Sequence, residues 1–285
     1  MPLDFGNISQ ALRIFAGATA HQSQEHIKPT HQYVALRLVL EGGFFPDEIT
    51  PHPPVKASRS RNGWILEYAP EQRTDSEQTV FGGMKTKQID VVVAKNGIGP
   101  VVAVSVKGTF RAYRNLVNRM EEAIGDSTNV HVMYPGLVYG FLSLLRANRQ
   151  SDGYLANDMG VAEDNTISPQ IRRYYAALCE MAGRRFIRND YTRYESVGLV
   201  LVENSAEAMG TINPLFPEPD TPLRVEPFFS KLFDIYDLRY PFRAEHLPSV
   251  RRAEWLTSSP LFQQVTELHG QSIEEILGYT PRICE

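Results

Sequence analysis

Two short apolar segments joined by a glycine-containing turn constrain the fold more than any other part of the chain. Residues 89–94 and 101–107 are short and rich in β-branched side chains, a composition that favours strands. The intervening Asn96-Gly97-Ile98-Gly99 supplies turn residues, and Pro100 is tolerated as the first residue of a strand. The sequence therefore predicts two consecutive strands, and the short turn favours a hairpin between them.

The register of that hairpin decides which polar side chains meet. If Lys95 pairs with Pro100, Asp90 falls opposite Ser105. Because side chains alternate along a strand, Ser105 and Lys107 point to the same face, and Lys107 becomes a diagonal neighbour of Asp90. A different closure of the loop would change this register. With the hairpin register, we expect Asp90, Ser105 and Lys107 on one face of the sheet.

The segment that follows carries the spacing of an amphipathic helix over residues 111–124. Its apolar stripe consists of Leu116, Val117, Met120, Ala123 and Ile124, and Gly125 follows as the expected C-cap. Residues 129–134 predict another strand, whereas the apolar residues 137–145 fit either kind of element. The order strand, strand, helix, strand predicts an α/β (α+β) fold, with a mixed central sheet flanked by helices.

The rest of the chain adds further elements without a clear linker between domains. We expect helices over residues 8–20, 31–41, 169–181, 226–237 and 260–277, strands over 64–68 and 197–202, and loops over 46–62 and 70–83. The prediction is one domain over residues 1–285. Its catalytic core covers about 31–150, and residues 151–285 supply dimerisation and DNA contacts.

Composition sets limits on the partners and the compartment of the protein. The formal net charge is -4, so a polyanion partner requires a local basic surface. The segment from Lys107 to Arg119 supplies one, because it holds four basic residues and no acidic residue. No stretch approaches the roughly 20 apolar residues of a membrane span, and the N-terminus lacks the pattern of a secretory signal. The cysteines, Cys179 and Cys284, lie far apart. We expect a cytoplasmic protein.

Polar residues of the predicted helix share one face. Arg111, Arg114, Asn118 and Glu121 are spaced by three, four and three residues, which places them together. Glu121 is then expected to fold back towards the end of the strand that carries Lys107. Two carboxylates, Asp90 and Glu121, suit Mg²⁺, and a lysine beside them suits the hydrolysis of phosphodiester bonds.

This combination resembles the PD-(D/E)XK nuclease superfamily. It is most similar to type II restriction endonucleases that recognise CCGG and CCNGG sites and carry the pattern S-x-K-x13-E. Here Ser105-Val106-Lys107 is followed by Glu121 at that interval. The resemblance implies a Mg²⁺-dependent enzyme that cleaves double-stranded DNA, with Asp90, Ser105, Lys107 and Glu121 in its active site. It also implies a glutamate on an N-terminal helix, for which Glu41 is the first candidate and Glu67 the second.

In the same group the segment R-x-(D/E)-R at the start of the helix reads C·G pairs. This chain has Arg111-Ala112-Tyr113-Arg114, so Tyr113 stands where an acidic residue is usual. The residues that the resemblance offers for DNA binding are Thr109, Arg111, Tyr113, Arg114, Asn118 and Arg119. Further candidates in the second half are Arg172, Arg173, Arg184 and Arg185, which surface solubility explains equally well.

A restriction enzyme that cuts a palindromic site pairs two active sites by two-fold symmetry, so we expect a homodimer or a tetramer. Three alternatives stay open. One is a repair or anti-phage defence nuclease of the same fold, with recognition that depends on DNA structure or modification. Another is a non-catalytic DNA-binding protein on a degenerate nuclease core. The third is a plain α/β domain in which the helix residues form surface pairs.

Overall fold

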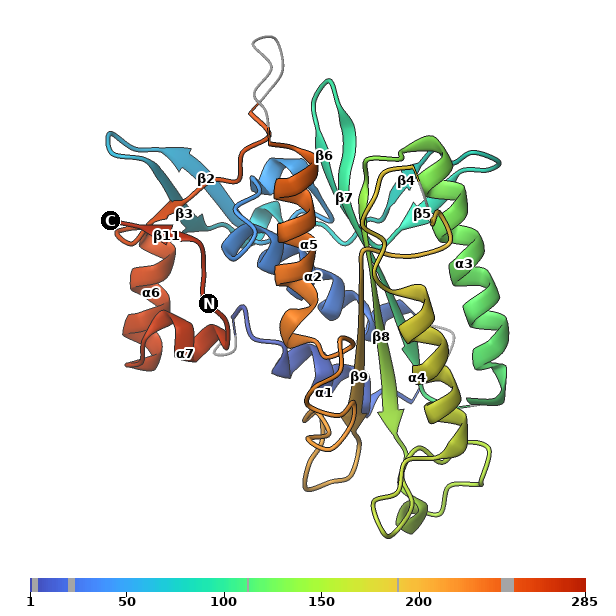
Figure 1. The fold of residues 1–285 in the computed structure, drawn as a ribbon. Helices are drawn as coiled ribbons and strands as arrows, with labels where there is room; N and C mark the ends of the chain where they lie inside the picture. The colour runs from blue at the N-terminus through green and yellow to red at the C-terminus, as the bar shows by residue number, and fades with distance from the viewer. Residues whose placement is uncertain (2–4, 20–23, 112, 189, 242–248) are drawn as a thin grey trace.

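A mixed five-stranded sheet forms the centre of the molecule (Figure 1). The computed structural model describes residues 1, 5–19, 24–111, 113–188, 190–241 and 249–285. In spatial order the strands are β1 (Ile49–Thr50), β6 (Val91–Lys95), β7 (Gly99–Thr109), β8 (Val138–Ala147) and β9 (Ser196–Glu203). The pairs β1/β6 and β6/β7 are antiparallel, and β7/β8 and β8/β9 are parallel. Because β9 belongs to this sheet, the second half of the chain contributes to the core.

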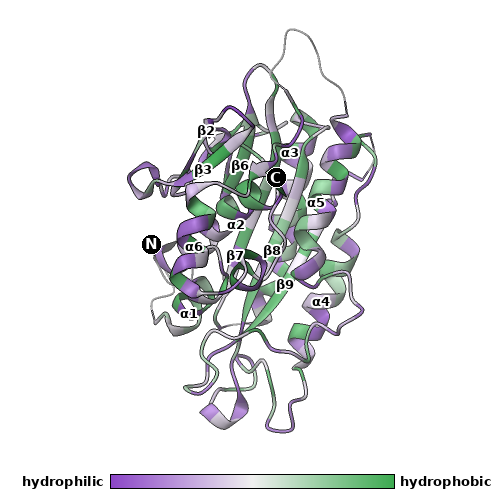
Figure 2. Cartoon of the chain, turned by 90° about the vertical axis from the view of Figure 1, so that its left-hand side faces the viewer, coloured by the Kyte–Doolittle hydropathy of each residue, from purple (hydrophilic) through white to green (hydrophobic). Residues whose placement is uncertain are grey.

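Helices cover both faces of the sheet, which makes the protein an α/β fold. The helices α1 (Ser9–Gly17), α2 (Lys28–Leu40) and α5 (Glu226–Arg239) pack on one face, and α3 (Leu116–Met133) and α4 (Pro169–Met181) cover the other. Strand β7 serves both layers, since Val102 and Val104 belong to the first core and Ala103 to the second. Strands buried on both faces are apolar along their length, as the green colour of β7, β8 and β9 in Figure 2 shows.

Smaller elements lie beside the central sheet. A second sheet consists of β11 (Ile283–Cys284), β10 (Trp255–Leu256), β3 (Trp64–Tyr68) and β2 (Val55–Arg59), next to α6 (Pro260–His269) and α7 (Ile273–Leu277). The strands β4 (Gln78–Val80) and β5 (Lys87–Ile89) form a separate hairpin. Within the described residues, no helix has both the length and the apolar character that a membrane crossing requires.

Most of the predicted elements are confirmed. The helices expected at 8–20, 31–41, 169–181, 226–237 and 260–277 correspond to α1, α2, α4, α5 and the α6–α7 pair. The strands expected at 64–68, 89–94, 101–107 and 197–202 correspond to β3, β6, β7 and β9, and the ambiguous segment 137–145 is β8. Ser168 caps α4 as its sequence suggests, since its side chain accepts a hydrogen bond from the backbone N–H of Ile171.

The predicted helix 111–124 and strand 129–134 are wrong in their boundaries and type. The helix α3 begins at Leu116, after a short 3-10 turn over Tyr113–Asn115, and continues to Met133. Gly125 does not end it, because this position is exposed and a glycine inside a helix costs only about 1 kcal/mol. The expected loops 46–62 and 70–83 contain the short strands β1, β2 and β4.

The predicted pairing of β6 with β7 is wrong by one residue next to the turn but correct at the far end of the hairpin. Next to the turn, Lys95 pairs with Gly99 rather than with Pro100. A bulge between Val93 and Ala94 then shifts the ladder by one residue, and the pairing continues as expected to its last pair, Val91 with Val104. Asp90 is therefore the first residue beyond the ladder, on the side of Ser105, as the sequence predicts.

Candidate active site

Asp90 occupies the junction between β5 and β6, where the ladder with β7 ends. Its side chain is only 8% exposed. The carboxylate Oδ2 accepts a hydrogen bond of 2.8 Å from the backbone N–H of Val106, a donor that lies beyond the last strand pair. The ammonium group of Lys107 lies 3.4 Å from the same oxygen. The backbone of β7 thus fixes the Asp90 carboxylate beside Lys107, which is 37% exposed.

Glu77 is brought to Asp90 by the β4–β5 hairpin. Gln78 pairs with Ile89 at the base of this hairpin, so the residues just outside the pair, Glu77 and Asp90, flank it from either strand. Burial raises the pKa of the Glu77 carboxyl, and the nearby Asp90 carboxylate raises it further, while Lys107 acts in the opposite direction. The carboxylates of Glu77 and Asp90 have oxygens within 4.8 Å of each other, and two negative charges at this distance repel unless a cation lies between them.

His31 comes from the first third of α2 and faces the same point. The side chain is 4% exposed, and its Nε2 atom lies 3.7 Å from Oδ1 of Asp90. In the described part of the chain, this buried nitrogen has no hydrogen-bond partner. Burial lowers the pKa of His31, with Asp90 acting against this change, so the neutral ring is favoured. A neutral imidazole with an unpaired nitrogen fits a metal ligand.

His31, Glu77 and Asp90 form a candidate metal centre. Each offers one ligand atom, and these three atoms lie within 4.8 Å of one another. One imidazole and two carboxylates are a donor set that divalent cations accept, and Lys107 supplies a positive charge at its side. The arrangement can bind a divalent cation and an anionic oxygen at the same place.

A small polar cavity adjoins Lys107 on the side of α3. It is lined by Ser105, Lys107, Arg119, Glu122, Ala123, Asp126, Phe141 and Tyr174. Asp126 is buried and pairs at 2.5 Å with Lys87, which also lies 3.9 Å from Glu122. Ser105 is buried as well, and its hydroxyl makes a 2.8 Å hydrogen bond with that of Tyr139. Ser105 therefore shares the face of Lys107, as expected, but supports the wall of the site.

Glu121 is not brought to the other predicted active-site residues. It lies on the outward side of α3 with Val117 and Ile124, which are 65% and 37% exposed. Among the described residues it makes no hydrogen bond or ion pair. The helix starts five residues later than expected, so Arg111 does not belong to the predicted polar face. Leu116, Met120 and Ala123 do pack inward, as predicted, and Glu122 takes the position towards Lys107.

Glu41 and Glu67 also lie elsewhere. Glu41 caps the C-terminal end of α2 and pairs with Arg37 at 2.5 Å. Ten residues of helix separate it from His31, a rise of about 15 Å. Glu67 belongs to β3 and pairs with Lys56. The same helix therefore does contribute to the site, but through His31 at its other end.

The residues predicted to contact DNA differ in exposure. Thr109 and Tyr113 are buried, and the Tyr113 hydroxyl donates to the backbone carbonyl of Arg146, so Tyr113 is not available to read bases. Arg111 is exposed, with its guanidinium 5.6 Å from the ring centre of Tyr154. Asn118 and Arg119 are exposed on α3. The side chain of Arg114 lies outside the described residues.

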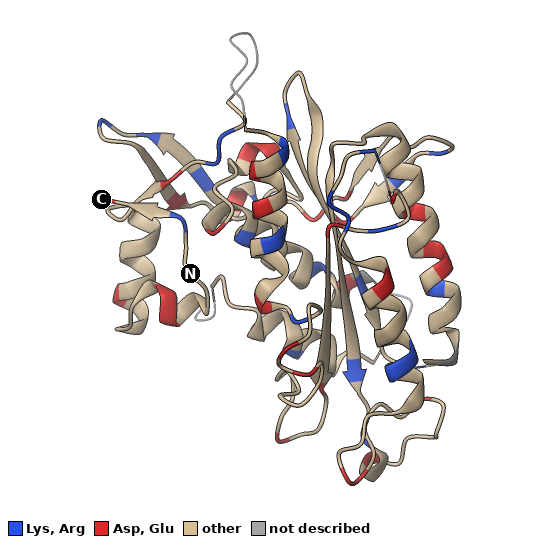
Figure 3. Ribbon diagram, in the orientation of Figure 1, with Lys and Arg blue, Asp and Glu red and all other residues tan. Residues whose placement is uncertain are grey.

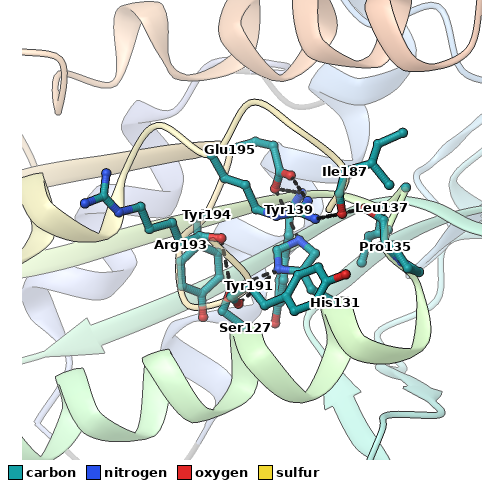
Figure 4. Close-up of polar contacts among 12 residues, drawn as sticks. Ser127, His131, Pro135, Leu137, Tyr139, Ile187, Tyr191, Arg193, Tyr194 and Glu195 are labelled. Atoms are coloured by element: carbon teal, nitrogen blue, oxygen red, sulfur yellow. Dashed lines mark hydrogen bonds and ion pairs between the residues drawn. The ribbon is translucent and has the colours of Figure 1, made fainter. Parts of the chain in front are cut away.

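Of the four arginines of the second half that were predicted as DNA contacts, Arg172, Arg173 and Arg185 are exposed, but Arg184 is fully buried. Arg184 belongs to a polar cluster that includes Glu195 and His131, which are labelled in Figure 4. The Glu195 carboxylate is 2.5 Å from Arg184, 2.6 Å from Arg239 and 3.4 Å from the His131 ring, and it accepts the backbone N–H of Tyr139. Arg184 is therefore a structural residue that ties the start of β8 to the start of β9, and not a DNA contact.

Two residues of the site were missed from the sequence, and each has a different signal. His31 lies in a helix in which all residues from Thr30 to Leu40 are buried, and an ionisable side chain is uncommon in a fully buried helix. Glu77 precedes the hairpin whose turn contains Gly82-Gly83, a dipeptide that marks turns.

Comparison of the chain with protein-family models, curated proteins and solved structures gives no match.

Proposed function

We propose that the protein is a divalent-metal-dependent endonuclease of the restriction type that hydrolyses double-stranded DNA. The observation that carries this proposal is the meeting of His31, Glu77 and Asp90 within 4.8 Å, with Lys107 against Asp90. The S-x-K strand and the preceding Asp90 also agree with the resemblance to PD-(D/E)XK nucleases. Two carboxylates favour Mg²⁺, and the imidazole adds affinity for Mn²⁺.

Each residue has a separate task in this proposal. His31, Glu77 and Asp90 hold the cation, which when bound polarises a phosphodiester and lowers the pKa of water. Lys107 stabilises the negative charge that develops on the phosphate oxygens. The backbone N–H of Val106 orients the Asp90 carboxylate, and the Ser105–Tyr139 hydrogen bond keeps the β7 face rigid. A buried, pre-oriented set of this kind suits hydrolysis of an inert ester.

The basic side chains around the site suit a duplex substrate. Arg111 and Arg119 are exposed near the end of β7 and the start of α3, where they can hold phosphates. Cleavage of both strands needs two such sites, so we propose that a homodimer acts on the DNA. Because Tyr113 is buried, it cannot contact bases, and any preference for a DNA sequence requires residues outside the segment 111–114 as well.

Digestion of plasmid DNA tests the proposal directly. The protein is incubated with DNA of known sequence in Mg²⁺, in Mn²⁺ and in EDTA, and the product ends are mapped. We expect cleavage with either metal, none with EDTA, and a loss of cleavage in the Lys107→Ala variant. Intact DNA under all metal conditions, with the protein folded, would overturn the nuclease function.

Substitution of Glu121 tests whether the active site consists of the residues that meet in the structure or of those in the S-x-K-x13-E pattern. Because this side chain is exposed and has no partner among the described residues, we expect Glu121→Ala to cleave DNA at about the wild-type rate. The matched change at the next position, Glu122→Ala, alters the wall beside Lys107 and should reduce the rate. Initial rates of plasmid nicking compare the two variants. A complete loss in Glu121→Ala would restore the S-x-K-x13-E assignment.

A further inference from the structure

The β4–β5 hairpin ends in a turn that exposes two large apolar side chains. Phe81 is 66% exposed and Met84 is 83% exposed, on either side of Gly82-Gly83. The turn continues directly into Lys85, which is also exposed. In Figure 1 this hairpin projects away from the central sheet beside α3. Exposed apolar side chains gathered at the tip of one element mark an interaction site more often than scattered ones do.

The backbone of this tip is held rigidly, in contrast to most loop ends. The side chain of Asn129, which is 1% exposed on α3, accepts hydrogen bonds from the backbone N–H groups of Met84 at 2.8 Å and Lys85 at 3.2 Å. It also donates to the Lys85 carbonyl at 2.8 Å, and the N–H of Gly83 donates to the backbone carbonyl of Asn129. The polar atoms of the turn face the protein, so its apolar side chains are presented outward.

Both glycines are needed for this close approach. A Cβ added at Gly82 would lie 2.1 Å from the Asn129 side chain, and one at Gly83 would lie 2.4 Å from the side chain of Val132. The turn is thus built to press its backbone against α3.

The charge and the position of the hairpin indicate its partner. Residues 78–89 contain two lysines and no acidic residue, in a chain with a net charge of -4, and Figure 3 shows blue segments on this hairpin. Lys87 pairs with Asp126 of α3, so Lys85 is the exposed positive charge at the tip. The base of the hairpin carries the candidate metal ligands Glu77 and Asp90. Four residues along the chain separate Glu77 at the base from Phe81 at the tip, a distance of roughly 13 Å. That span corresponds to about four base pairs of DNA.

We propose that the β4–β5 tip is a wedge that inserts Phe81 and Met84 between base pairs of the DNA, a few base pairs from the site of cleavage. Proteins that kink DNA insert apolar side chains such as Phe and Met in this way, next to basic residues that hold the backbone. The rigid turn supplies a fixed wedge, and Lys85 supplies the phosphate contact. This inference rests on the proposed nuclease function for its substrate, but it concerns distortion of the duplex rather than hydrolysis.

Duplexes that carry 2-aminopurine at successive positions test the wedge, because this base becomes brighter when it is unstacked. The wild-type protein is mixed with the duplexes in Ca²⁺ in place of Mg²⁺, so that binding is measured on intact DNA. It should raise the fluorescence several-fold at one or two positions. The double variant Phe81→Ala/Met84→Ala should lose this rise and bind DNA about tenfold or more weakly. The conservative pair Phe81→Tyr/Met84→Leu should keep it, and so should Leu215→Ala, which alters an apolar side chain of similar exposure (61%) elsewhere.

The possible outcomes separate this proposal from the nuclease function. Cleavage by the wild type without any fluorescence rise, or an equal rise in the double alanine variant, overturns the wedge alone. A rise that depends on Phe81 and Met84, in a protein that does not cleave in Mg²⁺ or Mn²⁺, supports the wedge and overturns the nuclease function. Light scattering tests whether the tip is instead a contact between two copies of the protein. If the only effect of Phe81→Ala/Met84→Ala is to convert a dimer to a monomer, the tip is a subunit contact and the wedge is rejected.

Discussion

Replacement of Asp90 by asparagine is expected to abolish DNA cleavage, with a fall in rate of about a thousandfold or more. The cation loses a charged ligand, and the several kcal/mol that a metal contributes to transition-state stabilisation correspond to this factor. Asparagine keeps an oxygen of the same shape, so the hydrogen bond from the Val106 N–H is retained and the fold is preserved. Plasmid cleavage under saturating Mg²⁺, together with thermal unfolding, measures both effects.

The matched control for this change is Asp47→Asn. Its carboxylate is 89% exposed and interacts only with the ring of His52 among its described neighbours, so the rate should stay close to that of the wild type. If Asp90→Asn cleaves DNA within a few-fold of the wild-type rate, Asp90 is not a ligand of the required metal.

The second large effect concerns stability. We expect Arg184→Ala to lower the free energy of unfolding by about 3–5 kcal/mol, since removal of one partner leaves a buried charge without full compensation. Arg184 and Glu195 are both fully buried and 2.5 Å apart. The adjacent change Arg185→Ala affects an exposed side chain and should cost less than about 0.5 kcal/mol. Urea unfolding at pH 7 compares the two variants, and a difference below 1 kcal/mol between them would contradict the structural role.

This contribution depends on pH in a defined direction. Burial acts to raise the pKa of Glu195, but the His131 ring and the guanidinium groups of Arg239 and Arg184 lower it overall. A carboxyl with a lowered folded-state pKa stabilises the protein fully above its unfolded pKa of about 4.3, and this stabilisation is lost as the pH falls through the folded pKa. The penalty of Arg184→Ala should therefore shrink at acidic pH, where Glu195 is protonated in both proteins.

The sequence predicted the sheet better than it predicted the site. Strands with continuous β-branched residues and a helix with an N-cap serine depend on local chemistry, so β6, β7 and α4 lie where expected. The start of α3 was misjudged because the segment before Leu116 has helical spacing, yet Tyr113–Asn115 form a 3-10 turn in which Tyr113 is buried and donates to the Arg146 carbonyl. Glu121 is absent from the site for a separate reason: the inward side of α3 carries Leu116, Met120 and Ala123, and Glu121 lies on the outward side.

Asp90 and Lys107 could be paired from the sequence because both belong to one short hairpin. His31 and Glu77 could not, since they reach the site through contacts between elements that are distant in the chain. His31 depends on the packing of α2 against β6 and β7, and Glu77 on the pairing of two three-residue strands. Periodicity does not encode either contact, and the interval S-x-K-x13-E drew attention to a helix position that faces solvent.

The most direct test of the metal centre is a Mn²⁺ titration followed by electron spin-echo spectroscopy, which detects a nitrogen ligand on the bound ion. The wild type should bind Mn²⁺ and show the modulation of an imidazole nitrogen, and His31→Gln should lose that modulation and bind about a hundredfold more weakly. Glu41→Gln, at the other end of α2, should match the wild type. A wild type that binds no Mn²⁺, or a nitrogen signal that persists in His31→Gln, would contradict the site formed by His31, Glu77 and Asp90.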